Sequence, residues 1–65
     1  MLFINGEEHP EAMGQSLASY LTAHGYAPER VAVERNCAIV PKSQFSTTTL
    51  QDGDQVEIVQ FVGGG

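Results

Sequence analysis

Cysteine, basic residues and long apolar runs are all scarce in this sequence, and each scarcity excludes a class of protein. The single cysteine, Cys37, allows no internal disulfide and no cysteine-based metal cluster, which is typical of a reducing setting. Only 3 basic residues face 8 acidic ones, for a net charge of −5, and nucleic-acid binding depends chiefly on Lys and Arg. No run approaches the roughly 20 apolar residues of a membrane span, and no basic segment followed by an apolar run suggests a signal peptide. We therefore expect a cytoplasmic protein with no nucleic-acid or membrane partner.

The chain nevertheless contains enough apolar residues for a folded domain. It has 65 residues, of which 42% are hydrophobic. A chain of this length buries only about 60% of the surface that its unfolded form exposes, which leaves no room for both a core and a deep active site. The excess of acidic residues has two readings: it favours docking on a basic partner surface, or it serves solubility alone.

Local signals divide the chain into five strands and one helix. Residues 2–4 form a short β-type run, Asn5-Gly6 is a strong hairpin signal, and the returning strand at 7–10 is polar and typical of a sheet edge. Ser16 suits a helix N-cap and Gly25 a left-handed C-terminal residue, which predicts a helix over residues 16–24. Its buried face should carry Leu17, Tyr20 and Leu21.

The second half of the chain reads as strands joined by turns. We expect strands at residues 31–33, 38–40 and 56–62, with turns at Asn36-Cys37 and Asp52-Gly53 and one helical turn within 42–49. The order strand, strand, helix, strand, strand, strand predicts an α+β fold of the β-grasp (ubiquitin-like) type. Four to five strands should form a mixed sheet with one main helix across one face, and the first and last strands should run parallel in its middle. This domain should span residues 1–62, with a flexible glycine tail at 63–65.

Alternation along the strands assigns side chains to the two faces of this sheet. Leu2, Ile4, Val56 and Ile58 should lie beneath the helix. Phe3, Val59 and Phe61 should then lie on the face without a helix, where they form either a partner-docking patch beside the tail or β-formers that a sheet surface tolerates.

Gly63, Gly64 and Gly65 follow the last strand directly. Glycines cannot add to a core, but three of them reach roughly 10 Å when extended, enough to enter a narrow channel in another protein. No helix follows them, so they are not a phosphate-binding loop. We expect the group at their tip to be the working group of the protein.

Several segments, taken together, resemble one family. They are Leu-Phe-Ile-Asn-Gly at 2–6, Gly-Gln-Ser-Leu at 14–17, Ile-Val-Pro at 39–41, Leu-Gln-Asp-Gly-Asp-Gln-Val-Glu-Ile at 50–58 and the final Gly-Gly. Over essentially its whole length the chain is similar to the ThiS family of sulfur carriers in thiamine biosynthesis. The Asp-Gly-Asp turn, the following strand and the Gly-Gly end form a fairly specific combination, although each alone is weak.

The resemblance implies a carrier rather than an enzyme, with no bound cofactor or metal. A ThiF-like activating enzyme would use ATP and Mg²⁺ to adenylate the Gly65 carboxylate, and a sulfur donor protein would convert the adenylate to a thiocarboxylate. A ThiG-like thiazole synthase would receive this sulfur for the thiamine thiazole ring. Gly63 and Gly64 would be recognised as part of the tail, and only the final pair, Gly64 and Gly65, is essential to the family motif.

Other functions stay open at this point. The chain could be a related sulfur carrier for molybdopterin synthesis, a ubiquitin-like protein modifier or an inert interaction module. His9 and His24 lack metal-ligand spacing, Ser16 is better explained as a cap than as a nucleophile, and Cys37 as an ordinary turn thiol. The acids should be mostly solvated, with Asp52 and Asp54 serving the turn; they are Glu7, Glu8, Asp52, Asp54 and Glu57.

Overall fold

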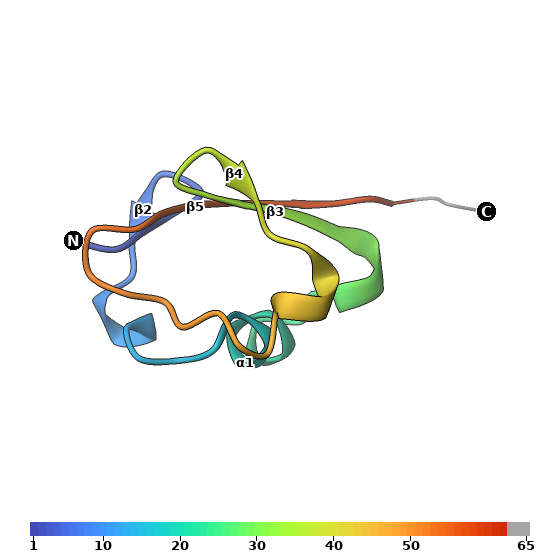
Figure 1. Cartoon of the computed structure of the whole chain (residues 1–65), viewed down its shortest axis with the longest axis horizontal. Helices are drawn as coiled ribbons and strands as arrows, with labels where there is room; N and C mark the ends of the chain where they lie inside the picture. The colour runs from blue at the N-terminus through green and yellow to red at the C-terminus, as the bar shows by residue number, and fades with distance from the viewer. Residues whose placement is uncertain (63–65) are drawn as a thin grey trace.

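The structure of the chain is a computed structural model, which describes residues 1–62 (Figure 1). Its regular elements, in chain order, are β1 (Phe3–Ile4), β2 (Glu7–Glu8), η1 (Pro10–Ala12), α1 (Leu17–Ala23), η2 (Pro28–Arg30), β3 (Val31–Arg35), β4 (Ala38–Ile39), η3 (Lys42–Gln44) and β5 (Gln55–Gln60), where η marks a 3₁₀ turn. None of the helices within residues 1–62 is long and apolar enough to cross a bilayer.

The five strands form one mixed sheet in the order β2-β1-β5-β3-β4. β1 and β5 run parallel, and all other neighbours are antiparallel. Helix α1 lies across one face of the sheet, and β5 runs through its middle toward the C-terminal end (Figure 1). The predicted β-grasp fold is therefore confirmed, including the parallel pairing of the first and last strands.

Two tight turns set the register of the outer hairpins. Asn5 and Gly6 join β1 to β2 with φ of 51° and 82°, and Asn36 and Cys37 join β3 to β4 with φ of 53° and 69°. Two successive residues with positive φ are the mark of a type I′ turn, whose twist matches that of the flanking strands. The predicted Asn5-Gly6 and Asn36-Cys37 turns are therefore confirmed.

Helix α1 has only seven residues, so contacts with the rest of the chain must stabilise it. The Ser16 hydroxyl accepts a hydrogen bond from the Ser19 N–H at 3.0 Å, as expected of an N-cap. The backbone N–H groups of Leu17 and Ala18, which no helical carbonyl can satisfy, donate to the carbonyls of Thr48 and Phe45. The connection after η3 therefore holds the start of the helix.

The core lies between α1 and one face of the sheet. Leu2, Ile4, Val56 and Ile58 are buried, as alternation predicted. The other buried apolar residues are Ala12, Leu17, Tyr20, Leu21, Val31, Val33, Phe45 and Leu50.

The strand bounds differ modestly from those expected. β3 extends to Arg35, two residues past its predicted end, because it pairs with β5 from Val31↔Gln60 to Arg35↔Val56. β5 begins at Gln55 and ends at Gln60, since residues beyond Gln60 face no strand partner in β3.

Candidate functional site

The central strand β5 precedes the glycine tail in the chain. The turns on both sides of β5 each bind it through an asparagine side chain. The Asn5 carboxamide accepts from the Ile58 N–H at 2.7 Å and donates to the Ile58 carbonyl at 3.3 Å. On the other side, the Asn36 carboxamide accepts from the Gln55 N–H at 2.9 Å. Each asparagine is thus a left-handed turn residue that also binds the backbone of β5. Asn5 makes two such hydrogen bonds and Asn36 makes one, which fixes β5 in the sheet.

The far end of β5 is also fastened. The Gln60 side-chain oxygen accepts from the Ala27 N–H at 3.0 Å, and the Phe61 N–H donates to the Arg30 carbonyl at 2.8 Å. Hydrogen bonding to the body of the protein therefore continues one residue beyond the strand. Gly63, Gly64 and Gly65, together with the predicted tail role, lie outside the described residues.

Asp54, at the start of β5, is the one buried charged residue of the described part of the chain. Its carboxylate accepts from the Arg35 Nε at 2.9 Å, the Asn36 Nδ2 at 3.0 Å and the Gln51 N–H at 3.0 Å. Burial raises the pKa of Asp54, but these three donors, led by Arg35, outweigh it and hold the pKa below the ordinary value. The expectation that Asp54 is mostly solvated is wrong, because the Asp52-Gly53 turn directs its side chain toward the β3–β4 hairpin.

The three residues predicted to form a docking patch do not all lie together. Val59 and Phe61 are more than half exposed, and alternation with the buried Val56 and Ile58 places them on the face of the sheet opposite α1. Phe3 lies on the same face but pairs with Gln55, six residues before Phe61, which places it about 20 Å from Phe61 along the strand. A patch of all three beside the tail is therefore wrong, because the parallel register carries β1 to the other end of β5.

Two residues that sequence reasoning passed over lie closer to Val59. Ala32 faces Val59 directly across the β3–β5 pair, and Ile39, 75% exposed, extends from the neighbouring edge strand β4. We call the exposed set Ala32, Ile39, Val59 and Phe61 the outer apolar patch. Alternation counted outward from the Asn36-Cys37 turn would have placed Ile39 on this face.

The histidines and the cysteine lie away from this strand end. The Glu11 carboxylate accepts a hydrogen bond from the His9 Nδ1 at 2.8 Å. The His9 ring lies edge-on to Tyr20, whose ring stacks on His24 with 4.1 Å between centroids. Both histidines thus pack against the helix. Cys37 is exposed in its turn, and within residues 1–62 no group of three or more His, Cys, Asp or Glu is arranged to hold a metal ion.

Comparison with known proteins adds to this geometry. The model of the ThiS family matches residues 2–65, nearly the whole chain and including the three glycines. The chain belongs to the ThiS family. This confirms the resemblance drawn from the hairpin, helix-start and Asp-Gly-Asp segments.

Solved structures of a ThiS-family protein share the fold. The crystal structure of the thiamine biosynthesis protein ThiS from Geobacter metallireducens has a TM-score of 0.75 and 36% identity, over 98% of this chain and 97% of that one. The sulfur carrier protein ThiS of Bacillus subtilis is 51% identical over 35 residues, covering 54% of this chain and 53% of that protein.

Longer relatives also contain a segment like this ThiS-family chain. A protein named thiazole synthase from Magnetococcus marinus is 45% identical over 64 residues, which cover 98% of this chain. The same segment makes up only 20% of that relative, and of a second thiazole synthase from Paramagnetospirillum magneticum. This chain therefore spans about a fifth of the length of these two relatives.

Proposed function

We propose that this protein is a sulfur carrier of thiamine biosynthesis, in which the Gly65 carboxylate becomes a thiocarboxylate. The observation that carries the proposal is the match of the ThiS family model through residue 65, at the end of a strand that is hydrogen-bonded as far as Phe61. Relatives named as a sulfur carrier and as thiamine biosynthesis proteins support this assignment.

The chemistry requires activation, because a carboxylate is a poor electrophile. Its charge is delocalised, and oxide is a poor leaving group. In the proposed sequence, a Gly65 oxygen attacks the α-phosphorus of ATP and releases pyrophosphate, which leaves an acyl adenylate. A persulfide on a donor protein then attacks the acyl carbon with its outer sulfur and expels AMP, which leaves an acyl disulfide. A second thiol attacks the donor's own sulfur, forms a disulfide with the donor and releases the outer sulfur as the thiocarboxylate.

The body of the protein supplies the positioning for these steps. Residues 1–62 contain neither a Walker-type loop nor a candidate metal site, so ATP and its Mg²⁺ belong to a ThiF-like partner in this proposal. Gly63 and Gly64 have no Cβ to meet the walls of a narrow channel. Val59 and Phe61 of the outer apolar patch, which precede the glycines in the chain, supply contact area that offsets the entropy lost when the tail is ordered.

The relatives named thiazole synthase support a ThiG-like acceptor for the sulfur, because a segment similar to this chain occurs within proteins of that name. The test is an intact-mass measurement after incubation with a ThiF-like enzyme, ATP and a sulfur donor. The mass should rise by the difference between sulfur and oxygen, and fragmentation should place the gain on Gly65. A chain with Gly64 and Gly65 deleted is the matched control and should gain nothing.

A further inference from the structure

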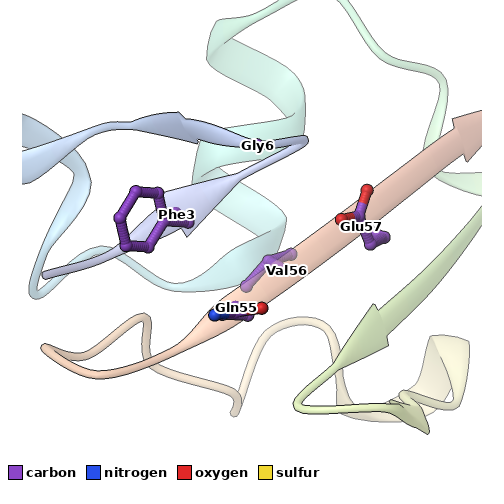
Figure 2. Close-up of a pocket in the computed structure, with 5 residues that line it drawn as sticks. All are labelled: Phe3, Gly6, Gln55, Val56 and Glu57. Atoms are coloured by element: carbon purple, nitrogen blue, oxygen red, sulfur yellow. The ribbon is translucent and has the colours of Figure 1, made fainter.

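A small pocket opens on the uncovered face of the sheet, where the β1–β2 turn passes beside β5 (Figure 2). Its lining consists of Phe3, Gly6, Gln55, Val56 and Glu57, and its volume is about 160 Å³. Sites for whole small molecules usually measure about 300 Å³ or more. This pocket is therefore too small for a nucleotide or cofactor and suits a single side chain.

The walls of the pocket differ in character. Figure 2 shows the Phe3 ring standing out from β1 and the Glu57 side chain on β5 at the other side, with Gln55 and Val56 between them. Phe3 is half-buried, and Gly6 leaves the space above its backbone open. An aromatic face opposite a carboxylate suits a cation carried on an apolar stem, since the ring attracts the charge and packs against the methylenes.

The register of the sheet adds a second carboxylate. Glu34 on β3 lies directly opposite Glu57 on β5, and both side chains are exposed. Side chains paired in this way have Cβ atoms only about 4.5–5.5 Å apart, and like charges there repel each other. Within residues 1–62 neither carboxylate forms an ion pair, while Arg35, the adjacent cation in β3, is bound to Asp54. The pair is thus left without compensation inside the described chain.

We infer that this pocket binds an arginine or lysine side chain of the activating partner, with its charge between the Phe3 ring and the Glu34–Glu57 pair. The inference rests on the proposed function, because it assigns the pocket to the enzyme that adenylates Gly65. Charge decides the occupant: an anion is repelled, and a neutral side chain would desolvate the carboxylates without pairing them. Because the pocket lies about 13–20 Å along β5 from Phe61, it provides a second point of attachment, which aligns the strand with the channel that takes the tail.

The pocket can be tested without the partner. The ¹⁵N-labelled protein is titrated with N-acetyl-arginine methylamide, and separately with the citrulline analogue, which has a similar shape and no charge. We expect saturable shifts at the amides of Gly6, Gln55 and Glu57 with the arginine probe and several-fold smaller shifts with the citrulline probe. Glu57→Gln should abolish the arginine response. Glu29→Gln, which removes the same charge from an exposed position on η2, should leave it intact.

Shifts spread evenly over all acidic positions, or a response that Glu57→Gln does not change, would overturn the inference. With a ThiF-like enzyme, Glu57→Gln should raise Kd about fivefold, as for one partly exposed ion pair, and the difference should shrink in high salt. Equal affinity of the Glu57→Gln and Glu29→Gln proteins would also overturn it. Deletion of Gly64 and Gly65 separates this inference from the carrier proposal, because that deletion should abolish sulfur loading and leave arginine binding unchanged.

Discussion

Replacing Asp54 by asparagine should destabilise the protein more than the other acid-to-amide substitutions, Asp52→Asn, Glu29→Gln and Glu57→Gln. The carboxylate has three donors around it, and asparagine offers only one oxygen. If that oxygen accepts the hydrogen bonds from Arg35 and Gln51, the new NH₂ group points at the NH₂ group of Asn36, and both are donors. Asn36 cannot rotate to relieve this contact without losing its bond from the Gln55 N–H.

The expected loss follows from these contacts. Hydrogen bonds to a charged acceptor are worth about 1 kcal/mol more than neutral ones, and each of the two opposed amide groups left unpaired costs about 1 kcal/mol. The Arg35 side chain is a third exposed, which reduces its share through solvent screening. We expect a loss of about 2–3 kcal/mol, out of the roughly 3–10 kcal/mol of a 65-residue domain. The melting temperature should fall by roughly 8–24 °C.

The assay is urea and thermal unfolding of the Asp54→Asn protein beside Asp52→Asn, a matched change two residues away at an exposed carboxylate. The pKa of Asp54 is lowered in the folded state, so its stabilisation is present above the ordinary value of 3.8 and disappears as the pH falls through the folded pKa. The difference between parent and Asp54→Asn should therefore narrow as the pH falls below 3.8 and through the lowered pKa of the folded state. Equal stability of the two variants at pH 7 would refute the reasoning.

Three further changes test other parts of the structure. Cys37→Gly should stabilise by about 0.5–1 kcal/mol in urea unfolding, because it relieves the φ of 69°, whereas Gly6→Ala should destabilise by about 1 kcal/mol; a loss on Cys37→Gly would contradict the turn assignment. Glu57→Gln should raise the melting temperature in low salt only, since it removes repulsion from Glu34, and a gain that persists in 1 M salt would exclude that cause. Phe61→Asp should weaken binding to the activating enzyme by about 1–3 kcal/mol in calorimetry and preserve the circular dichroism spectrum, and global unfolding would show that Phe61 is needed for the core.

Local chemistry made much of the fold predictable. Asn5-Gly6, the Ser16 cap and Gly25 each act through their own backbone geometry, so short segments suffice to reveal them. Alternation assigned Leu2, Ile4, Val56 and Ile58 to the buried face, because a strand presents successive side chains to opposite faces.

The predictions that went wrong depend on pairing between distant segments. Arg35 and Asp54 are 19 residues apart, and only the β3–β5 register brings them together, so the burial of Asp54 could not be read from the local turn signal. Phe3 was grouped with Phe61 by face alone. The parallel register with β5, which places Phe3 beside Gln55, cannot be obtained from alternation.

The candidate site likewise has parts that the sequence predicts and parts that depend on the folded sheet. The glycines and the family segments are each short, unbroken stretches of sequence, so they identified the ThiS family without a structure. The pocket of Phe3, Gly6 and Glu57 combines a turn, an inner strand and the central strand. It therefore becomes visible only when the sheet is assembled.

The central claim is that the terminal carboxylate is the reacting group and that the folded body positions it. The direct measurement is the intact mass of this protein, and of the same protein made as a Gly65 C-terminal amide, after incubation with a ThiF-like enzyme, ATP and a sulfur donor. The account predicts that the free acid exchanges one oxygen for sulfur at Gly65 and that the amide is unchanged. Sulfur gained equally by both, or located on Cys37, would contradict it.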